Sequence, residues 1–421
     1  MSEWFMSLTI IIFLLVYIAM GFGKLPGFKV DRTGAAVIGA LAMMAVGSIT
    51  PPQAWNAIDY RTIGMLFGLM VVSASFVVSG FYSWTANRVA MLKVSAPVLL
   101  AVLIAVGGLL SALLTNDVVV VAMTPLLVSI TLSRGLNPVP FLLGFCFAAN
   151  NGASGSLIGS PQNMIAAQGL DISFVGLLQA SAVPALLSLP LTWAVLVFLY
   201  RNRWYLAKTS VDGAAATPTP STDPATKLDV WETSKAGIIT LIVIIAFVIS
   251  DIPRELIALT AAGFLLLNRS IASSDMLKLV DGNLLLLIMG LFVVNAAFAS
   301  TGLPQQMLND LRNNGVELNN PIVLFLITGV LSTIVGNNPA VMLLVPFLSS
   351  SGNTDSLGAA LVLGSGFSSN LFVFGSLAGI IVVEQAAAYG VKISFSEFAK
   401  SGGIVALLCM LLAAAWIVLV L

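Results

Sequence analysis

Four clusters of polar residues interrupt apolar stretches of this 421-residue chain, and these are the places where chemistry can occur. Two clusters are short, at 115–117 and 336–339, and two are longer, at 150–156 and 368–376. In a membrane protein, backbone without helical hydrogen bonds is tolerated only where it is buried in protein or lines a wet cavity. Asn and Ser side chains add hydrogen-bonding partners at such breaks, although they can also simply hold helices together. The clusters predict a site for a small solute, with the candidate binding residues Asn116, Asn150, Asn151, Ser154, Ser156, Asn337, Asn338, Ser368, Ser369, Asn370 and Ser376.

Asp117 is the clearest candidate for ion coupling because it stands between two apolar runs. A carboxylate at membrane depth is costly and is usually functional, since it can bind a proton or another cation. The alternative is a carboxylate that is held only by backbone N–H groups at the start of a helix. Glu384 is the second candidate, and for it a role at the membrane interface is equally open.

The composition is that of a membrane protein, with 58% hydrophobic and 9% charged residues, whereas soluble domains carry about 25% charged residues. The net charge is zero, and no basic block indicates nucleic acid. The absence of His removes most metal sites, catalytic triads and His proton relays, so no cofactor and no metal is expected. Cys146 and Cys409 lie in apolar runs and are predicted to be small buried hydrophobes. An intramembrane protease would need a Ser–His pair, two catalytic Asp residues or a metal site. The sequence has no His and only one clear Asp at membrane depth, so an enzyme is disfavoured.

Ten segments are long and apolar enough to cross a membrane, which requires about 17–25 mostly apolar residues. Two of them, 138–168 and 357–389, are too long and too polar in the middle for one unbroken helix. Two further stretches, 97–131 and 321–350, have polar centres and are predicted to be re-entrant hairpins, each entering and leaving on one side. The other spans are predicted at 5–22, 33–50, 62–82, 174–200, 235–250, 255–268, 284–301 and 401–421.

The two halves of the chain match at an offset of about 222 residues, and rare polar residues keep the register. The matched pairs include Gly68 with Gly290, Arg32 with Arg254, Asp59 with Asp281, Asn116 with Asn337, and Asn150 with Asn370. Each half has five spans, so the second half is inverted relative to the first, as in many secondary transporters and unlike most channels. The predicted fold is an all-α polytopic membrane protein made of two inverted-topology repeats. Each repeat has five spans, a re-entrant hairpin and a broken helix, at 1–200 and 234–421, with a linker at 201–233.

The distribution of positive charge predicts the orientation in the membrane. With the N-terminus outside, all but three of the 18 Lys and Arg residues fall on the cytoplasmic side, the exceptions being Arg61, Arg254 and Arg312. We therefore expect both termini outside and the linker 201–233 in the cytoplasm. No Lys or Arg falls inside a predicted span, so we expect a binding site without either.

The inverted repeat, the polar hairpin tips and the broken helices resemble the ion transporter superfamily over essentially the whole chain except the linker. That group includes divalent anion/sodium symporters, citrate–metal carriers, sodium/proton antiporters and arsenite efflux pumps. Asn116-Asp117, Asn337-Asn338-Pro339 and the run 375–378 look most like the arsenite/antimonite efflux pumps. The Gly159–Asn163 stretch also resembles bacterial homologues of the divalent anion symporters.

The resemblance implies a secondary transporter in the bacterial inner membrane that exports arsenite or antimonite against proton entry. It also implies a cytoplasmic arsenite-stimulated ATPase as a partner. The alternative is sodium- or proton-coupled transport of an inorganic or dicarboxylate anion. Arsenite near neutral pH is mostly an uncharged trihydroxide, which suits a pocket of amides and hydroxyls. Capture of arsenite by thiolates does not fit, because the chain has only two cysteines and they lie far apart in the sequence.

Overall fold

A computed structural model describes residues 3–206, 228–348 and 353–421 of the chain. In this part of the chain every regular element is helical, apart from two isolated bridges between single residues. Seven of the helices are long and apolar enough to cross a membrane by length and composition. The all-helical, polytopic fold is therefore confirmed.

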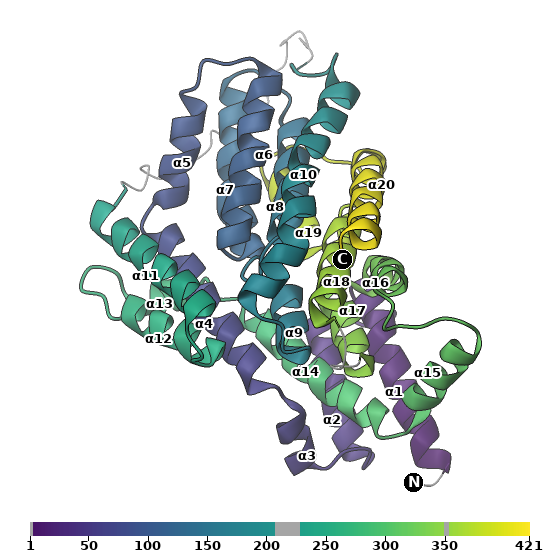
Figure 1. Ribbon diagram of the computed structural model, residues 1–421. Coiled ribbons are helices and arrows are strands. Elements are labelled where there is room, and N and C mark those ends of the chain that lie inside the picture. Colours follow the sequence, from purple (N-terminus) through teal and green to yellow (C-terminus); the bar gives the residue numbers. More distant parts are fainter. Residues whose placement is uncertain (1–2, 207–227, 349–352) are drawn as a thin grey trace.

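The first half contains ten helices, of which α6 and α7 form the first hairpin and α8 and α9 the first broken helix (Figure 1). Their bounds are α1 Glu3–Phe22, α2 Arg32–Ala45, α3 Pro51–Ala57, α4 Tyr60–Val78, α5 Phe81–Ala90, α6 Ala96–Leu113, α7 Asn116–Ser133, α8 Pro138–Ala153, α9 Pro161–Gly169 and α10 Phe174–Tyr200.

The second half repeats this order, with α16 and α17 as the second hairpin and α18 and α19 as the second broken helix. The bounds are α11 Val230–Ile249, α12 Arg254–Leu266, α13 Ser273–Leu277, α14 Gly282–Ala299, α15 Leu303–Asn313, α16 Pro321–Val335, α17 Asn337–Leu344, α18 Thr354–Ser368, α19 Leu377–Ala388 and α20 Phe395–Leu419, with single 3₁₀ turns at Val345–Phe347 and Val373–Gly375.

Both predicted hairpins and both predicted broken helices are present. The sequence missed the short helices α3, α5, α13 and α15, which lie between spans and are too short or too polar to give a span signal. It also placed two helix starts too late, because α11 begins at Val230 and α20 at Phe395. Each of these starts is a polar turn capped by a side chain, Asp229 or Ser394, that accepts a backbone N–H. Hydropathy does not detect such a turn, because it detects apolar residues.

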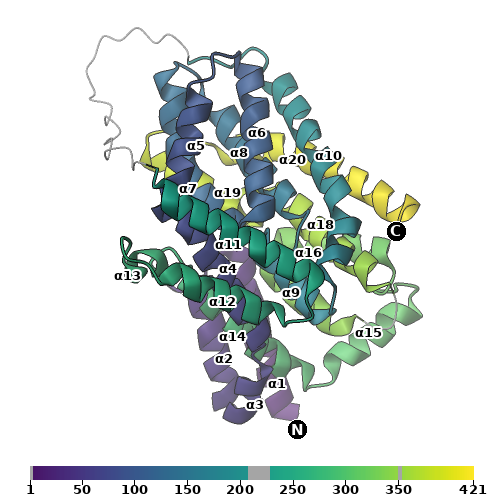
Figure 2. The same cartoon turned by 60° about the vertical axis from the view of Figure 1, so that its left-hand side comes forward.

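The helices form two groups, which we call the scaffold and the core (Figure 2). The scaffold comprises α1, α2 and α4 with their counterparts α11, α12 and α14, and it is held together by packing of α4 on α12 and of α14 on α2. The core comprises α6–α10 and α16–α20. Within the core, the hairpin of each half packs against the half-helix of the other, α7 on α19 and α17 on α9. The two hairpin tips are thereby brought close to both helix breaks.

The scaffold interface depends on two glycines that occupy matching positions in the repeat. A Cβ added at Gly68 would lie 2.5 Å from the backbone carbonyl carbon of Ala258, and one at Gly290 would lie 2.8 Å from that of Ala36. Only glycine permits this approach of the two backbones. The repeated Gly-Leu-X-Val-Val run is thus a helix-packing motif.

The two halves do not contact the scaffold at equivalent points. Ser73 of α4 accepts a hydrogen bond from the backbone N–H of Thr115, at the tip of the first hairpin. Its counterpart Asn295 of α14 instead donates to the carbonyl of Met342, well beyond the second hairpin tip at Gly336. The core is therefore displaced along the scaffold, towards the end at which α2 and α14 begin.

Arg32 and Arg254, another matched pair, show the same displacement. At the start of α2, Arg32 donates to the carbonyl of Phe374, in the middle of the second broken helix. At the start of α12, Arg254 donates to the carbonyl of Ile172, beyond the outer end of the first broken helix. The centre of the core thus lies level with one end of the scaffold and away from the other.

Candidate functional site

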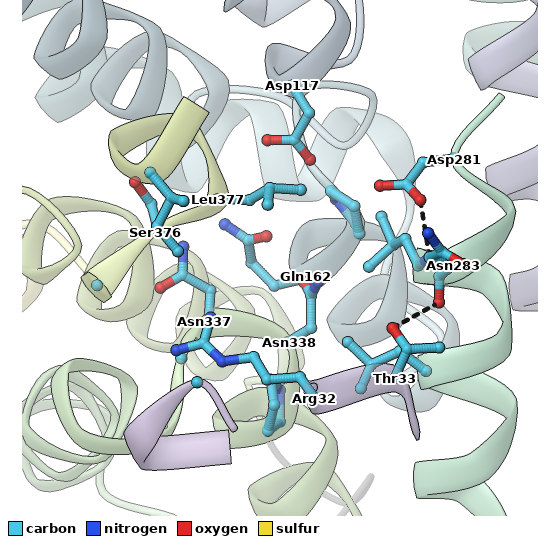
Figure 3. Close-up of a pocket in the computed structure, with 18 of the residues that line it drawn as sticks. Arg32, Thr33, Asp117, Gln162, Asp281, Asn283, Asn337, Asn338, Ser376 and Leu377 are labelled. Carbon is cyan, nitrogen blue, oxygen red and sulfur yellow. Dashed lines mark hydrogen bonds between the residues drawn. The ribbon is translucent and has the colours of Figure 1, made fainter. Parts of the chain in front are cut away.

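A cavity of about 420 Å³ lies where both hairpin tips and the second broken helix meet the starts of α2 and α14 (Figure 3). Its polar and charged lining residues come from six separate parts of the chain. They are Asp31, Arg32, Thr33, Asn116, Asp117, Gln162, Asp281, Asn283, Asn337, Asn338, Ser376 and Glu384. Six of these twelve, Asn116, Asp117, Asn337, Asn338, Ser376 and Glu384, are residues that the sequence predicted.

Asp117 lies at the start of α7, and its carboxylate points into the cavity (Figure 3). Among the described residues the carboxylate has neither a hydrogen bond nor an ion pair. The alternative of a carboxylate held only by backbone N–H groups therefore finds no support, since those groups do not bond to it. Glu384 reaches the same cavity from α19.

Two asparagines of the hairpin tips line the cavity, and the side-chain oxygen of each is buried without a hydrogen-bond partner in the described part of the chain. They are Asn116 and Asn338. Asn116 is only 5% exposed, so its oxygen is cut off from bulk solvent. An unpaired buried acceptor costs about 1–3 kcal/mol, and a hydroxyl or water donor in the cavity would remove that cost.

Three other predicted asparagines form a buried chain of amide hydrogen bonds instead of lining the cavity. Asn150 donates to the side-chain oxygen of Asn370 at 2.9 Å, and Asn370 donates to that of Asn151 at 2.8 Å. Asn116 extends the chain at one end by donating to Asn150 at 3.5 Å. Ser376 joins it by accepting a hydrogen bond from Asn150 at 3.1 Å. The network ties the broken helices of the two halves to each other and to the first hairpin tip.

The four remaining predicted serines donate to backbone carbonyls and lie away from the cavity wall. Ser154 bonds to Asn150 O, Ser156 to Ala112 O, Ser368 to Ser365 O and Ser369 to Gly366 O. These hydroxyls stabilise the backbone where it leaves the helix. In addition, Ser376 caps α19 by accepting from the backbone N–H of Gly379, and its counterpart Ser156 accepts from that of Gly159 in the turn before α9.

The expectation of a site without Lys or Arg is wrong, because Arg32 lines the cavity. Sequence reasoning also missed Thr33, Gln162, Asp281 and Asn283. Arg32 and Asp281 looked like charges at the ends of loops. The displacement of the core brings the cavity to the starts of α2 and α14, where these two residues lie. The available signal was the repeat itself, which matches Arg32 with Arg254 and Asp281 with Asp59.

The charged groups on the cavity wall are four carboxylates against one guanidinium. The carboxylates belong to Asp31, Asp117, Asp281 and Glu384, and the guanidinium to Arg32. Within the described ranges, no group of three or more Asp, Glu, Cys or His residues is placed to hold a metal ion. Such a lining repels a free multivalent anion and suits a neutral solute together with protons.

Both cysteines are buried and lie away from the cavity, as predicted. Cys409 accepts a weak hydrogen bond from the Asn151 amide at 3.6 Å, and Cys146 is fully buried. Neither thiol is therefore placed to bind a solute in the cavity.

The model of a family of citrate transporters, CitMHS, matches residues 10–366. The chain belongs to this family. The 46 kDa membrane protein of Mycobacterium leprae is 27% identical over 91% of this chain and 93% of its own length. The silicon efflux transporter LSI3 of Oryza sativa is 29% identical over 47% of this chain and 39% of its own length.

Among solved structures, MtrF of Neisseria gonorrhoeae, described as illuminating a class of antimetabolite efflux pumps, has the same fold with a TM-score of 0.60. It is 14% identical, and the match covers 99% of this chain and 95% of that one. Membership of the CitMHS family agrees with the superfamily resemblance in the sequence. The protein is therefore a secondary transporter in a membrane.

Proposed function

We propose that this CitMHS-family transporter exports arsenite or antimonite as the neutral hydroxide, driven by proton entry. The observation that carries the proposal is that the cavity is lined by carboxylates and by two asparagines whose side-chain oxygens are unpaired in the described structure. Each hydroxyl of a neutral metalloid hydroxide can donate to an amide oxygen such as that of Asn116 or Asn338. The relative named for silicon efflux fits this chemistry, since silicic acid is also a neutral polyhydroxyl near neutral pH.

Expression of the protein in arsenite-sensitive cells should restore growth on arsenite and lower the arsenic content of the cells. Purified protein in vesicles should then accumulate arsenite against its gradient when a pH gradient is imposed, with no ATP present. Accumulation without ATP would show that the arsenite-stimulated ATPase implied by the resemblance is not required. Unchanged sensitivity and no uptake, from protein that is present in the membrane, would reject the proposal.

The second candidate function is transport of a carboxylate anion, and Arg32 is the observation that favours it. Its guanidinium faces the cavity beside Asn337 (Figure 3) and could pair with one carboxylate of a substrate. The family description, citrate transporter, points the same way. Uptake of labelled citrate and of a dicarboxylate, with and without sodium, should be measured in parallel with arsenite. Strong anion uptake without arsenite uptake would establish this alternative.

With the charge-based orientation, the cavity would open to the cytoplasm, as a site that loads solute for export requires. We expect a cysteine introduced into the linker, at Ser210 for example, to react with an impermeant maleimide only after the cells are opened. The two native thiols are buried and should stay silent, and a version with both replaced by alanine serves as the background control. Labelling of the linker in intact cells would reverse the orientation.

A further inference from the structure

The two carboxylates of Asp117 and Asp281 face each other across the upper part of the cavity (Figure 3). They come from different groups of helices, since Asp117 begins α7 in the core and Asp281 precedes α14 in the scaffold. Asp117 follows a buried turn, whereas the two residues after Asp281, Gly282 and Asn283, are exposed to solvent. Both aspartates are half-buried, and of the two only Asp281 is followed directly by exposed residues.

Asp281 caps α14, but capping uses only one of its two oxygens. Its Oδ1 accepts the backbone N–H of Leu284 at 3.0 Å, and its Oδ2 has no hydrogen-bond partner in the described structure. The counterpart Asp59 also caps α4, with its Oδ1 accepting the backbone N–H of Arg61, but its second oxygen accepts the hydroxyl of Thr62 at 2.5 Å. The residue that matches Thr62 in the repeat is Leu284, which has no hydroxyl. Of these two matched aspartates, only Asp281 therefore keeps a carboxylate oxygen without a partner in the described structure.

A second observation concerns the residue before Asp117. Asn116 lines the cavity, and its buried side-chain oxygen has no hydrogen-bond partner in the described structure. Such an oxygen can accept a hydrogen bond from water or from a hydroxyl of the solute.

We propose that Asp281 is a proton relay, which takes the proton from Asp117 and passes it to water at the mouth of the cavity. This inference rests on the proposed proton coupling. Asp117 binds and releases the coupled proton, and Asp281 accepts it on Oδ2 and then loses it to water, so that both carboxylates return to their starting state. The other charged groups that face Asp281 across the cavity are Asp31, Arg32 and Glu384. A relay of this kind sets the rate of proton release and leaves the number of protons per cycle unchanged.

The test compares Asp281→Asn with wild type in inverted membrane vesicles under an imposed pH gradient, with arsenite or the anion that wild type transports. Asn caps a helix as well as Asp does but cannot carry a proton, so folding should be retained. The initial rate of uptake should fall on the order of tenfold or more, as expected when a positioned proton acceptor is lost. The final accumulation should be unchanged, because a relay does not alter the equilibrium. Exchange of internal for external solute without net proton movement should also keep its rate, and Asp281→Glu should restore most of the uptake rate.

The matched control is Asp59→Asn, which changes the equivalent cap on α4 and should leave every rate as in wild type. An unchanged uptake rate in Asp281→Asn would overturn the relay. A lower final accumulation would also overturn it, because Asp281 would then be a coupling group itself. An equal loss of exchange would overturn it as well, because that result would indicate a structural role. If wild type fails to respond to the pH gradient, the proposed proton coupling fails and the relay fails with it.

Discussion

Replacing Asp117 by Asn should abolish proton-driven accumulation while the protein still folds and binds its substrate. Asn is nearly isosteric with Asp but cannot titrate, and the carboxylate of Asp117 has no hydrogen-bond or ion-pair partner in the described structure whose loss would destabilise the fold. Transport into inverted vesicles under an imposed pH gradient measures the effect. The final accumulation should fall to the level of vesicles without the protein, in contrast to the purely kinetic effect expected for Asp281→Asn.

Exchange of substrate across the membrane should survive in Asp117→Asn, because exchange involves no net movement of protons. Asn338→Asp serves as a second control, since Asn338 is the counterpart of Asp117 at the other hairpin tip and is followed by Pro339 instead of Val118. In combination with Asp117→Asn, it should not restore accumulation. If Asp117→Asn still concentrates substrate in response to the gradient, the coupling group lies elsewhere, and Glu384 is the next cavity carboxylate to replace.

Replacing Gly68 by Leu should remove most of the folded protein from the membrane. A Cβ at this position would lie 2.5 Å from the backbone of Ala258, which cannot move aside as a flexible side chain could. Overpacking of a close contact typically costs about 1–3 kcal/mol, and a clash with backbone should reach the upper end of that range. Gly290→Leu should act in the same way at the equivalent contact with Ala36. Thermal unfolding in detergent, followed by size-exclusion chromatography, measures the loss.

The control for the glycine substitutions is Gly263→Leu, in the helix that packs against Gly68. Gly263 is exposed, and a Cβ added there would meet no atom within 4 Å. Leucine also has a higher helix propensity than glycine, so this variant should be as stable as wild type or slightly more stable. Equal stability of Gly68→Leu and wild type would mean that the two scaffold helices can separate without cost.

The architecture could be predicted from the sequence because its strongest signals are local or periodic. Apolar runs of sufficient length indicate spans, and polar residues in their middle indicate breaks, so both hairpins and both broken helices were found. The repeat then joined segments far apart in the chain without any knowledge of contacts. Pairs such as Asn150 and Asn370 showed that polar residues recur at matching depths, and these two residues do meet, at 2.9 Å.

Which of the buried polar residues reach the cavity could not be predicted in the same way. Asn116 and Asn150 belong to the same kind of cluster, yet only Asn116 lines the cavity, whereas the side chain of Asn150 donates to Asn370 and Ser376. The cavity also includes Arg32 and Asp281, whose positions at helix starts gave no sign of burial. Their contribution depends on how far the core is displaced along the scaffold, and that displacement is a property of packing between distant elements.

The displacement of the core has a thermodynamic consequence. Because the two halves are built alike, a shift of the core in the opposite direction along the scaffold would exchange their roles. Asn295 would then face the second hairpin tip, and Ser73 would face a helix of the first hairpin beyond its tip. Most contacts would be replaced by their own counterparts, so the two positions should have nearly equal free energies. The balance would then be set only by residues that differ between the halves, such as Ser73 and Asn295 or Thr62 and Leu284. Each such difference amounts to about one hydrogen bond, or about 0.5–1.5 kcal/mol. Imperfections of the repeat would thus determine which side of the membrane the empty protein faces.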